Sequence, residues 1–196
     1  VGFSVVAVRA PEADGGAAII KREPRRLDLS AIAKGLGVDQ IYTLLDDQGY
    51  ANFLVEIGGE VRVKGDKDGL GWKIAVEKPI KGERAVEQVL SLKNVALATS
   101  GDYRNYREID GVAYSHTIDP STGRPVTHQL ASVTVADSEC AMADGWATTL
   151  LVLGPDKGYE LAVSRKIPAM FIERSGDTFI VKQTPRFERL LAGEVE

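Results

Sequence analysis

The sequence lacks several features that would assign it to a familiar class. Its one cysteine, Cys140, cannot form a disulfide within the chain. No run of apolar residues approaches the length of about 18 that a membrane-spanning helix needs. Positive charge is not in excess, since the formal net charge is -4. The chain therefore has no electrostatic footprint for a polyanion, which argues against nucleic acid as a partner.

Repeats, low-complexity stretches, linkers and a signal peptide are also absent. Because the chain begins at Val1 rather than at a methionine, the missing signal peptide says nothing about export. With 44% apolar and 27% charged residues, the composition is that of an ordinary globular protein, and 196 residues are enough to bury a core. The sequence therefore predicts one domain over residues 1–196.

Alternating apolar residues and turn signals predict a series of short strands. The expected strands cover 1–9, 17–21, 52–57, 60–64, 72–77, 86–92, 106–109, 112–117, 132–136, 169–173 and 178–182. A polar loop at 11–16 separates the first two, and Asp110-Gly111 is a strong signal for a hairpin turn. Such strands, joined by hairpins and accompanied by few helices, indicate an α+β fold with a mostly antiparallel sheet and packed helices.

Three helices are expected, at about 30–47, 138–153 and 155–166. Ser30 is the expected cap of the first helix, and Asp137 or Ser138 that of the second. The first helix should end at Gly49 and the second at Gly154-Pro155. Four residues at helical spacing form the expected buried stripe of the first helix: Val38, Ile41, Leu44 and Leu45.

A lysine and two glycines mark the start of the first helix. Residues 28–35, DLSAIAKG, place Lys34 and Gly35 there, and Gly37 follows. The helix dipole disfavours a lysine in the first turn, and a bound anion would explain it. The glycine spacing matches neither a P-loop nor a dinucleotide-binding fingerprint. The pattern predicts a phosphate site of another kind, and an ordinary surface lysine is the alternative.

A carboxylate and a hydroxyl, Asp144 and Thr148, lie four residues apart in the second helix and so share a face. The rest of 140–153 is mostly apolar or small, and an acid in such a helix is costly to bury unless it is paired or binds a metal. Carboxylate and hydroxyl oxygens suit hard cations such as Mg²⁺. A solvated helix face is the alternative. A cation site beside a phosphate site predicts chemistry on a phosphorylated substrate.

Thr99, Ser100 and Gly101 follow an apolar strand and predict a turn whose backbone N–H groups face an anion. A plain transition from strand to loop is the alternative. Both interpretations concern the segment 96–104, which also contains Asp102.

His116 lies where a strand ends in a rigid turn, within 114–125. It could be a core histidine, a general base or a ligand contact. A metal site built from His116, His128 and Asp119 would match no standard spacing.

Five stretches of the chain resemble the ApbE family, whose members are flavin transferases that move FMN from FAD onto a protein threonine. They occur in the family's order and cover about two-thirds of the chain. They are LDLSAIAKGLGVD at 27–39, VEIGGE at 55–60, ATSGDYRNY at 98–106, YSHTIDPSTGRP at 114–125 and SVTVADSECAMADGWATTLLVL at 132–153.

The resemblance implies roles for individual residues. It places FAD contacts on Asp28 and Lys34, and Ile118 beside the FAD. It implies that the backbone carbonyl of Ala31 is a ligand of Mg²⁺, and that Asp144 and Thr148 complete the ion site. We assign Thr99, Ser100 and Gly101 to the FAD site as well, because an anion-binding turn is expected there.

The resemblance also implies the reaction, in which Mg²⁺ assists the attack of an acceptor threonine on the FMN-side phosphorus of FAD, and AMP leaves. The implied acceptors are flavin-carrying subunits of respiratory sodium pumps and related electron-transfer complexes. Two alternatives remain open. The enzyme could use water, as an FAD pyrophosphatase that gives FMN and AMP, or the protein could bind flavin without catalysis.

The family has an N-terminal segment, with a methionine-glycine-threonine motif and flavin-ring contacts, that nothing in 1–21 matches. We therefore expect an N-terminally incomplete ApbE-like domain. The resemblance also implies a location on the periplasmic side, with any anchor to a membrane surface in a segment outside this chain.

The acceptor hydroxyl must lose a proton, and a group that titrates near neutrality would help. His116 is the first candidate for this base by residue type, and Asp102 is the second. The alternative for His116 is a hydrogen bond that only holds its loop.

Overall fold

The computed structural model describes residues 6–10, 16–24, 26–80, 82, 85–102, 106–109 and 112–193, and only the backbone of 106–109 and 112–115. The elements follow in this order: β1 (Val6–Arg9), β2 (Ala18–Lys21), α1 (Ala33–Asp47), β3 (Phe53–Ile57), β4 (Glu60–Lys64), β5 (Trp72–Glu77), β6 (Val86–Leu92), β7 (Val95–Gly101), β8 (Tyr106–Ile109), β9 (Val112–Ser115), β10 (Ile118–Asp119), β11 (Arg124–Pro125), β12 (Leu130–Asp137), α2 (Cys140–Leu153), α3 (Pro155–Ser164), β13 (Ala169–Ser175), β14 (Thr178–Gln183) and α4 (Pro185–Leu191).

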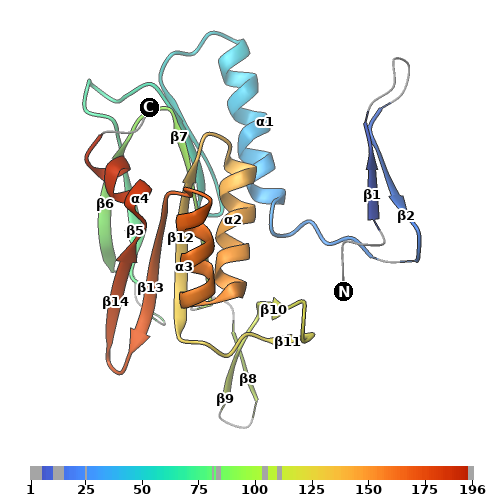
Figure 1. Cartoon of the computed structure of the whole chain (residues 1–196). Coiled ribbons are helices and arrows are strands. Elements are labelled where there is room, and N and C mark those ends of the chain that lie inside the picture. Colours follow the sequence, from blue (N-terminus) through green and yellow to red (C-terminus); the bar gives the residue numbers. More distant parts are fainter. Residues whose placement is uncertain are drawn as a thin grey trace.

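The main sheet has six strands in the order β14-β13-β12-β7-β4-β3, and every neighbouring pair is antiparallel. Helices α1, α2 and α3 lie along one face, and α4 and the β5–β6 hairpin lie on the other side (Figure 1). The β1–β2 hairpin stands apart from this body in the same view. No helix in the described part of the chain is long and apolar enough to cross a membrane.

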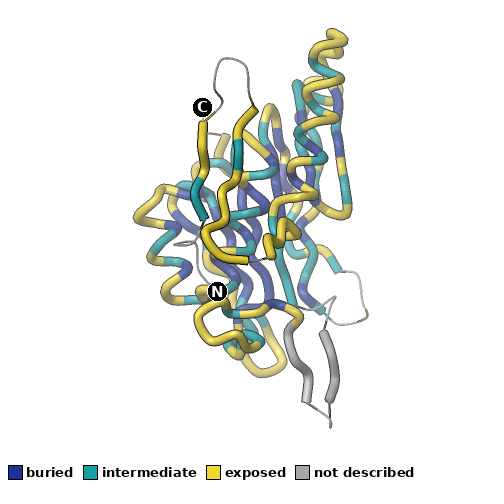
Figure 2. Tube along the Cα trace, turned by 90° about the vertical axis from the view of Figure 1, so that its right-hand side faces the viewer, coloured by how far each residue is buried: buried dark blue, intermediate teal, exposed yellow. Residues whose placement is uncertain are grey.

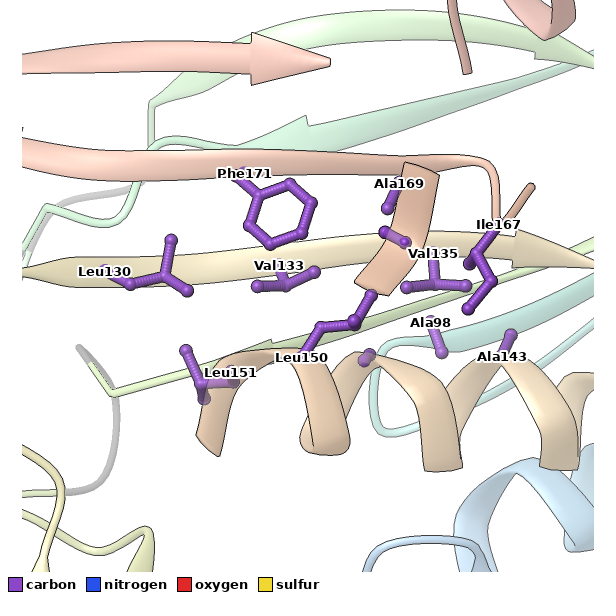
Figure 3. Packing of buried hydrophobic residues seen from close by; sticks show 12 residues of the cluster. Ala98, Leu130, Val133, Val135, Ala143, Leu150, Leu151, Ile167, Ala169 and Phe171 are labelled. Atoms are coloured by element: carbon purple, nitrogen blue, oxygen red, sulfur yellow. The ribbon is translucent and has the colours of Figure 1, made fainter. Parts of the chain in front are cut away.

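Strand β12 lies at the centre of the sheet and is buried on both faces (Figure 2). Its alternation of apolar and polar residues therefore does not separate a core face from a solvent face. Val133 and Val135 pack against Leu150 of α2 and Phe171 of β13 (Figure 3). The hydroxyl of Thr134, which is also buried, pairs with that of Thr99 in β7 at 2.9 Å. Burial of this polar group costs little because it is hydrogen-bonded.

Helices α1 and α2 cross at very close range. A Cβ atom on Gly35, in the first turn of α1, would lie 2.4 Å from the carbonyl oxygen of Cys140, the first residue of α2. The two oxygens of Asp39 in α1 accept the N–H groups of Cys140 and Ala141, both at 2.9 Å. Asp144 in α2 accepts the N–H of Gly35 at 3.0 Å. Each helix thus supplies the carboxylate that caps the other.

The predicted α+β class with a mostly antiparallel sheet is confirmed, and the three predicted helices are present. Gly49 has φ 82° after α1, and Gly154 has φ 83° after α2, as expected of glycines that end helices. Helix α4 and the short β10–β11 pair were not predicted. The loop residues 11–15, the first strand residues 1–5 and the turn at 110–111 lie outside the described residues.

The predicted helix caps are wrong. Helix α1 begins at Ala33 without a side-chain cap, and the Ser30 hydroxyl instead donates to Asp28. Helix α2 begins at Cys140, also without a cap from its own preceding residues. In both cases the capping carboxylate comes from the other helix, so a local sequence rule could not find it.

The predicted stripe of α1 is half wrong. Val38 is fully buried and Leu45 packs against the core, but Ile41 and Leu44 are 42% and 56% exposed. The approach of Gly35 to α2 sets the rotation of the helix, which turns Val38 and Tyr42 toward Phe53 of β3. The predicted turn at 99–101 is also wrong, because β7 continues as a strand to Gly101.

We expect Gly35→Ala to destabilise the protein. The new methyl group would meet the backbone of α2, and overpacking of this kind costs about 1–3 kcal/mol, which exceeds the gain of roughly 0.5–1 kcal/mol from alanine in a helix. Urea unfolding should show the loss. Gly37→Ala is the matched control, because its Cβ would meet only the end of the Ile57 side chain, at 3.1 Å. Equal stability of the two variants would contradict the close crossing.

Candidate functional site

A cleft of about 1440 Å³ lies beside the last residues of β7. Strand β12 pairs with β7 as far as Gly101, but β4 pairs with it only as far as Leu97. The edge of β7 beyond Leu97 therefore faces the cleft rather than another strand. All of the predicted site residues except Asp102 line this cleft: Asp28, Ala31, Lys34, Thr99, Ser100, Gly101, His116, Ile118, Asp144 and Thr148.

Asp144 lies on the side of the cleft that α2 forms, and it is only 3% exposed. Burial raises its pKa, and the hydrogen bond from Gly35 and the charge of Lys34 oppose that effect. Oxygen Oδ2 accepts the Gly35 N–H, and no other hydrogen bond to the carboxylate is found among the described residues. The second oxygen can therefore serve as a ligand for a cation without breaking the cap.

Thr148 lies one turn after Asp144 on the same face of α2, as predicted. Its hydroxyl pairs with that of Ser100 at 2.9 Å, which joins the helix to the end of β7. Ala31 lies in the turn before α1 and lines the same cleft. Oxygen-bearing residues of α2, of the turn before α1 and of β7 thus line one cleft.

Lys34 is half-exposed, and its Nζ lies 2.6 Å from Oε2 of Glu60. Glu60 is 2% exposed, and burial raises its pKa while Lys34 lowers it. The stem of Lys34 passes over Gly58, where an added Cβ would meet Lys34 Cδ at 3.4 Å. The prediction from sequence missed Glu60, although a carboxylate directly after Gly58-Gly59 in a matched stretch could have drawn attention to it.

Asp28 lies at the mouth of the cleft and is exposed. Its carboxylate accepts the N–H of Ser30 at 2.9 Å as well as the Ser30 hydroxyl. The hydroxyl and the backbone N–H of Ser30 hold the pKa of Asp28 below its usual value. The side chain is therefore an ionised acceptor in a local turn at neutral pH.

His116 and Ile118 reach the cleft from the segment between β9 and β11, and both are exposed. Between them Thr117 is buried, and its carbonyl accepts the N–H of Val126 at 3.0 Å. The carboxylate of Asp119 accepts the N–H and the hydroxyl of Ser121, which closes the predicted rigid turn. The turn fixes the backbone that carries His116.

Asp102, the second candidate for the base, does not line the cleft. Its two oxygens accept from Arg174, at 2.5 and 3.0 Å, in a partly buried ion pair that ties β7 to β13. With both oxygens engaged by Arg174, and outside the cleft, this carboxylate is not placed to accept a proton from a hydroxyl bound there. The alternative metal site of His116, His128 and Asp119 does not form among the described residues, which contain no group of three or more histidine, cysteine or acidic side chains placed to hold an ion.

Residues 1–171 match the model of the ApbE family. The FAD:protein FMN transferase of Vibrio cholerae serotype O1 is 48% identical over 167 residues, which cover 85% of this chain and 50% of that protein. The solved flavin transferase ApbE from Vibrio cholerae has a TM-score of 0.82 and 42% identity over 96% of this chain and 58% of that one. The apo form of flavinyl transferase ApbE from Pseudomonas stutzeri has a TM-score of 0.82 and 38% identity, and the match covers 100% of this chain and 58% of that one. The chain spans about half the length of the curated relatives it matches.

We expect Asp144→Asn to stabilise the metal-free protein at neutral pH. Asparagine keeps an acceptor for the Gly35 N–H but removes a charge whose burial is unfavourable. The pKa of Asp144 is raised in the folded state, so protonation of this carboxyl stabilises the fold at pH values below its unfolded pKa. This stabilisation is lost as the pH rises through the folded pKa. The advantage of the variant should therefore grow from pH 4 upward, to be measured by urea unfolding in EDTA.

The comparison variant is Asp119→Asn, because hydrogen bonds from Ser121 lower the pKa of Asp119. That variant should lose stability at neutral pH. If both variants are less stable than the wild type at neutral pH, burial of the Asp144 charge does not destabilise the folded protein.

Proposed function

The chain belongs to the ApbE family, and from this we propose that its cleft binds FAD with Mg²⁺ and transfers FMN to a threonine hydroxyl of an acceptor protein, with release of AMP. The resemblance seen in the sequence is confirmed at the level of the family. One observation carries the proposal: the predicted phosphate-binding lysine and the predicted pair of ion ligands, more than a hundred residues apart in sequence, line one cleft.

The charges of the cleft favour a metal-dependent reaction. The acidic side chains among its described lining residues are Asp28, Glu56, Glu77 and Asp144, against the two basic side chains of Lys34 and Lys73. A pyrophosphate would be repelled by such a lining unless a cation accompanied it. Asp144, Thr148 and the Ala31 carbonyl would hold Mg²⁺, which would supply that charge and stabilise negative charge on the phosphate oxygens.

The chain's own residues would then orient the reactants. Lys34 would bind a phosphate oxygen, and Ile118 would lie against the flavin nucleotide. The acceptor Oγ forms a bond to the FMN-side phosphorus while the bond from that phosphorus to the AMP oxygen breaks. The hydroxyl proton passes to His116, the lining residue whose type suits this role at neutral pH. As acceptors we propose flavin-carrying subunits of electron-transfer complexes, and as location the periplasmic side.

The direct test is mass spectrometry of a threonine-containing acceptor peptide after incubation with FAD, Mg²⁺ and the chain. We expect a mass gain equal to bound FMN, with one AMP per transfer. Asp144→Ala should abolish the gain at limiting Mg²⁺, and Asp156→Ala, in the first turn of α3 and outside the cleft, should not. Free FMN with an unmodified peptide would instead indicate hydrolysis. Retained FAD without AMP would indicate binding alone.

His116→Asn should lower the transfer rate at saturating FAD and leave FAD affinity nearly unchanged. Asparagine can hydrogen-bond the loop but cannot accept the proton. The rate of the wild type should fall on the acid side, where a protonated base can no longer accept the proton, and the variant should lack this limb. A pH–rate profile that is the same in both proteins would remove His116 from the role of base.

A further inference from the structure

Glu60 is a deeply buried carboxylate whose charge partner among the described residues is Lys34. It begins β4 directly after the turn at Gly58-Gly59. Lys34 lines the cleft, whereas Glu60 does not. The lysine therefore lies between the carboxylate and the space that the phosphate would occupy.

The burial of Glu60 is costly to the fold. Desolvation outweighs the attraction of Lys34, so the pKa of Glu60 is raised. A neutral side chain of the same shape would fill the same volume without this cost, and buried ion pairs are often no more stable than such replacements. The contact of this buried carboxylate with Lys34 therefore points to a role other than stability.

The contact constrains a side chain that is otherwise mobile. A lysine has four rotatable carbon–carbon bonds in its stem, and each that must be ordered on binding lowers affinity. Gly58 lies under the stem of Lys34, and Glu60 holds its Nζ at 2.6 Å. The ammonium group is thus placed before any ligand arrives.

We propose that Glu60 is a positioning residue for the phosphate site: from behind Lys34, it holds the ammonium group toward the pyrophosphate of the substrate. This inference rests on the proposed function for the identity of the ligand. It needs no contact between Glu60 and the ligand.

The test is a double-mutant cycle of Glu60→Gln and Lys34→Ala, with FAD affinity measured by calorimetry in Mg²⁺. Glutamine keeps the shape but forms only a neutral hydrogen bond, so we expect a dissociation constant about tenfold higher. Its melting temperature should be unchanged or higher. In the Lys34→Ala background the same substitution should change nothing further, because Glu60 acts through Lys34. Equal effects in both backgrounds, or a lowered melting temperature, would show a merely structural role.

A second measurement uses no flavin. Acetic anhydride should label Lys34 several times faster in Glu60→Gln than in the wild type, because the amine is no longer held in an ion pair with Glu60. Lys93, which pairs with Asp66, is the internal reference and should not change. Unchanged labelling of Lys34 would overturn the inference. If the wild type fails to bind FAD with Mg²⁺, the proposed function is wrong, and the labelling alone decides whether Glu60 holds Lys34.

Discussion

The exchange of carboxylate caps between α1 and α2 is the contact on which the cleft depends. Asp39 satisfies the first N–H groups of α2, and Asp144 satisfies an N–H in the first turn of α1. Arg62 in β4 pairs with Asp39 at 2.6 Å, which ties the crossing to the sheet. Because Gly35 has no side chain, the helices approach closely enough for both caps to form at once. Neither helix can rotate without breaking a cap of the other.

The crossing also explains why the site residues converge. The cap from Asp144 holds the start of α1 against α2, so the turn with Ala31 and the first-turn Lys34 lie beside Asp144 and Thr148. The remaining side of the cleft is the end of β7, which extends beyond the last residue that pairs with β4. Asp144 thus serves the fold with one oxygen and leaves the other for the proposed ion.

The outline of the fold could be predicted because local signals mark its elements, such as the glycines that end α1 and α2. The caps and the rotation of α1 could not, since both arise from contacts between segments far apart in sequence. Asp144 and Lys34 could be nominated because an acid in an apolar helix and a lysine in a first turn are unusual. The position of Glu60 after Gly58-Gly59 could have drawn attention to it, but its burial and its pairing with Lys34 arise from tertiary packing and could not be predicted.

The caps have a consequence for how the protein folds. The bonds from Asp39 to α2 span 101 and 102 residues, and the bond from Asp144 to Gly35 spans 109. Contacts of such long range form only after a large loop has closed, which slows folding and couples distant parts of the chain. No short fragment contains both halves of the cleft. Its assembly should therefore belong to the last, cooperative step of folding, so that truncation within β4 to β12 removes the site altogether.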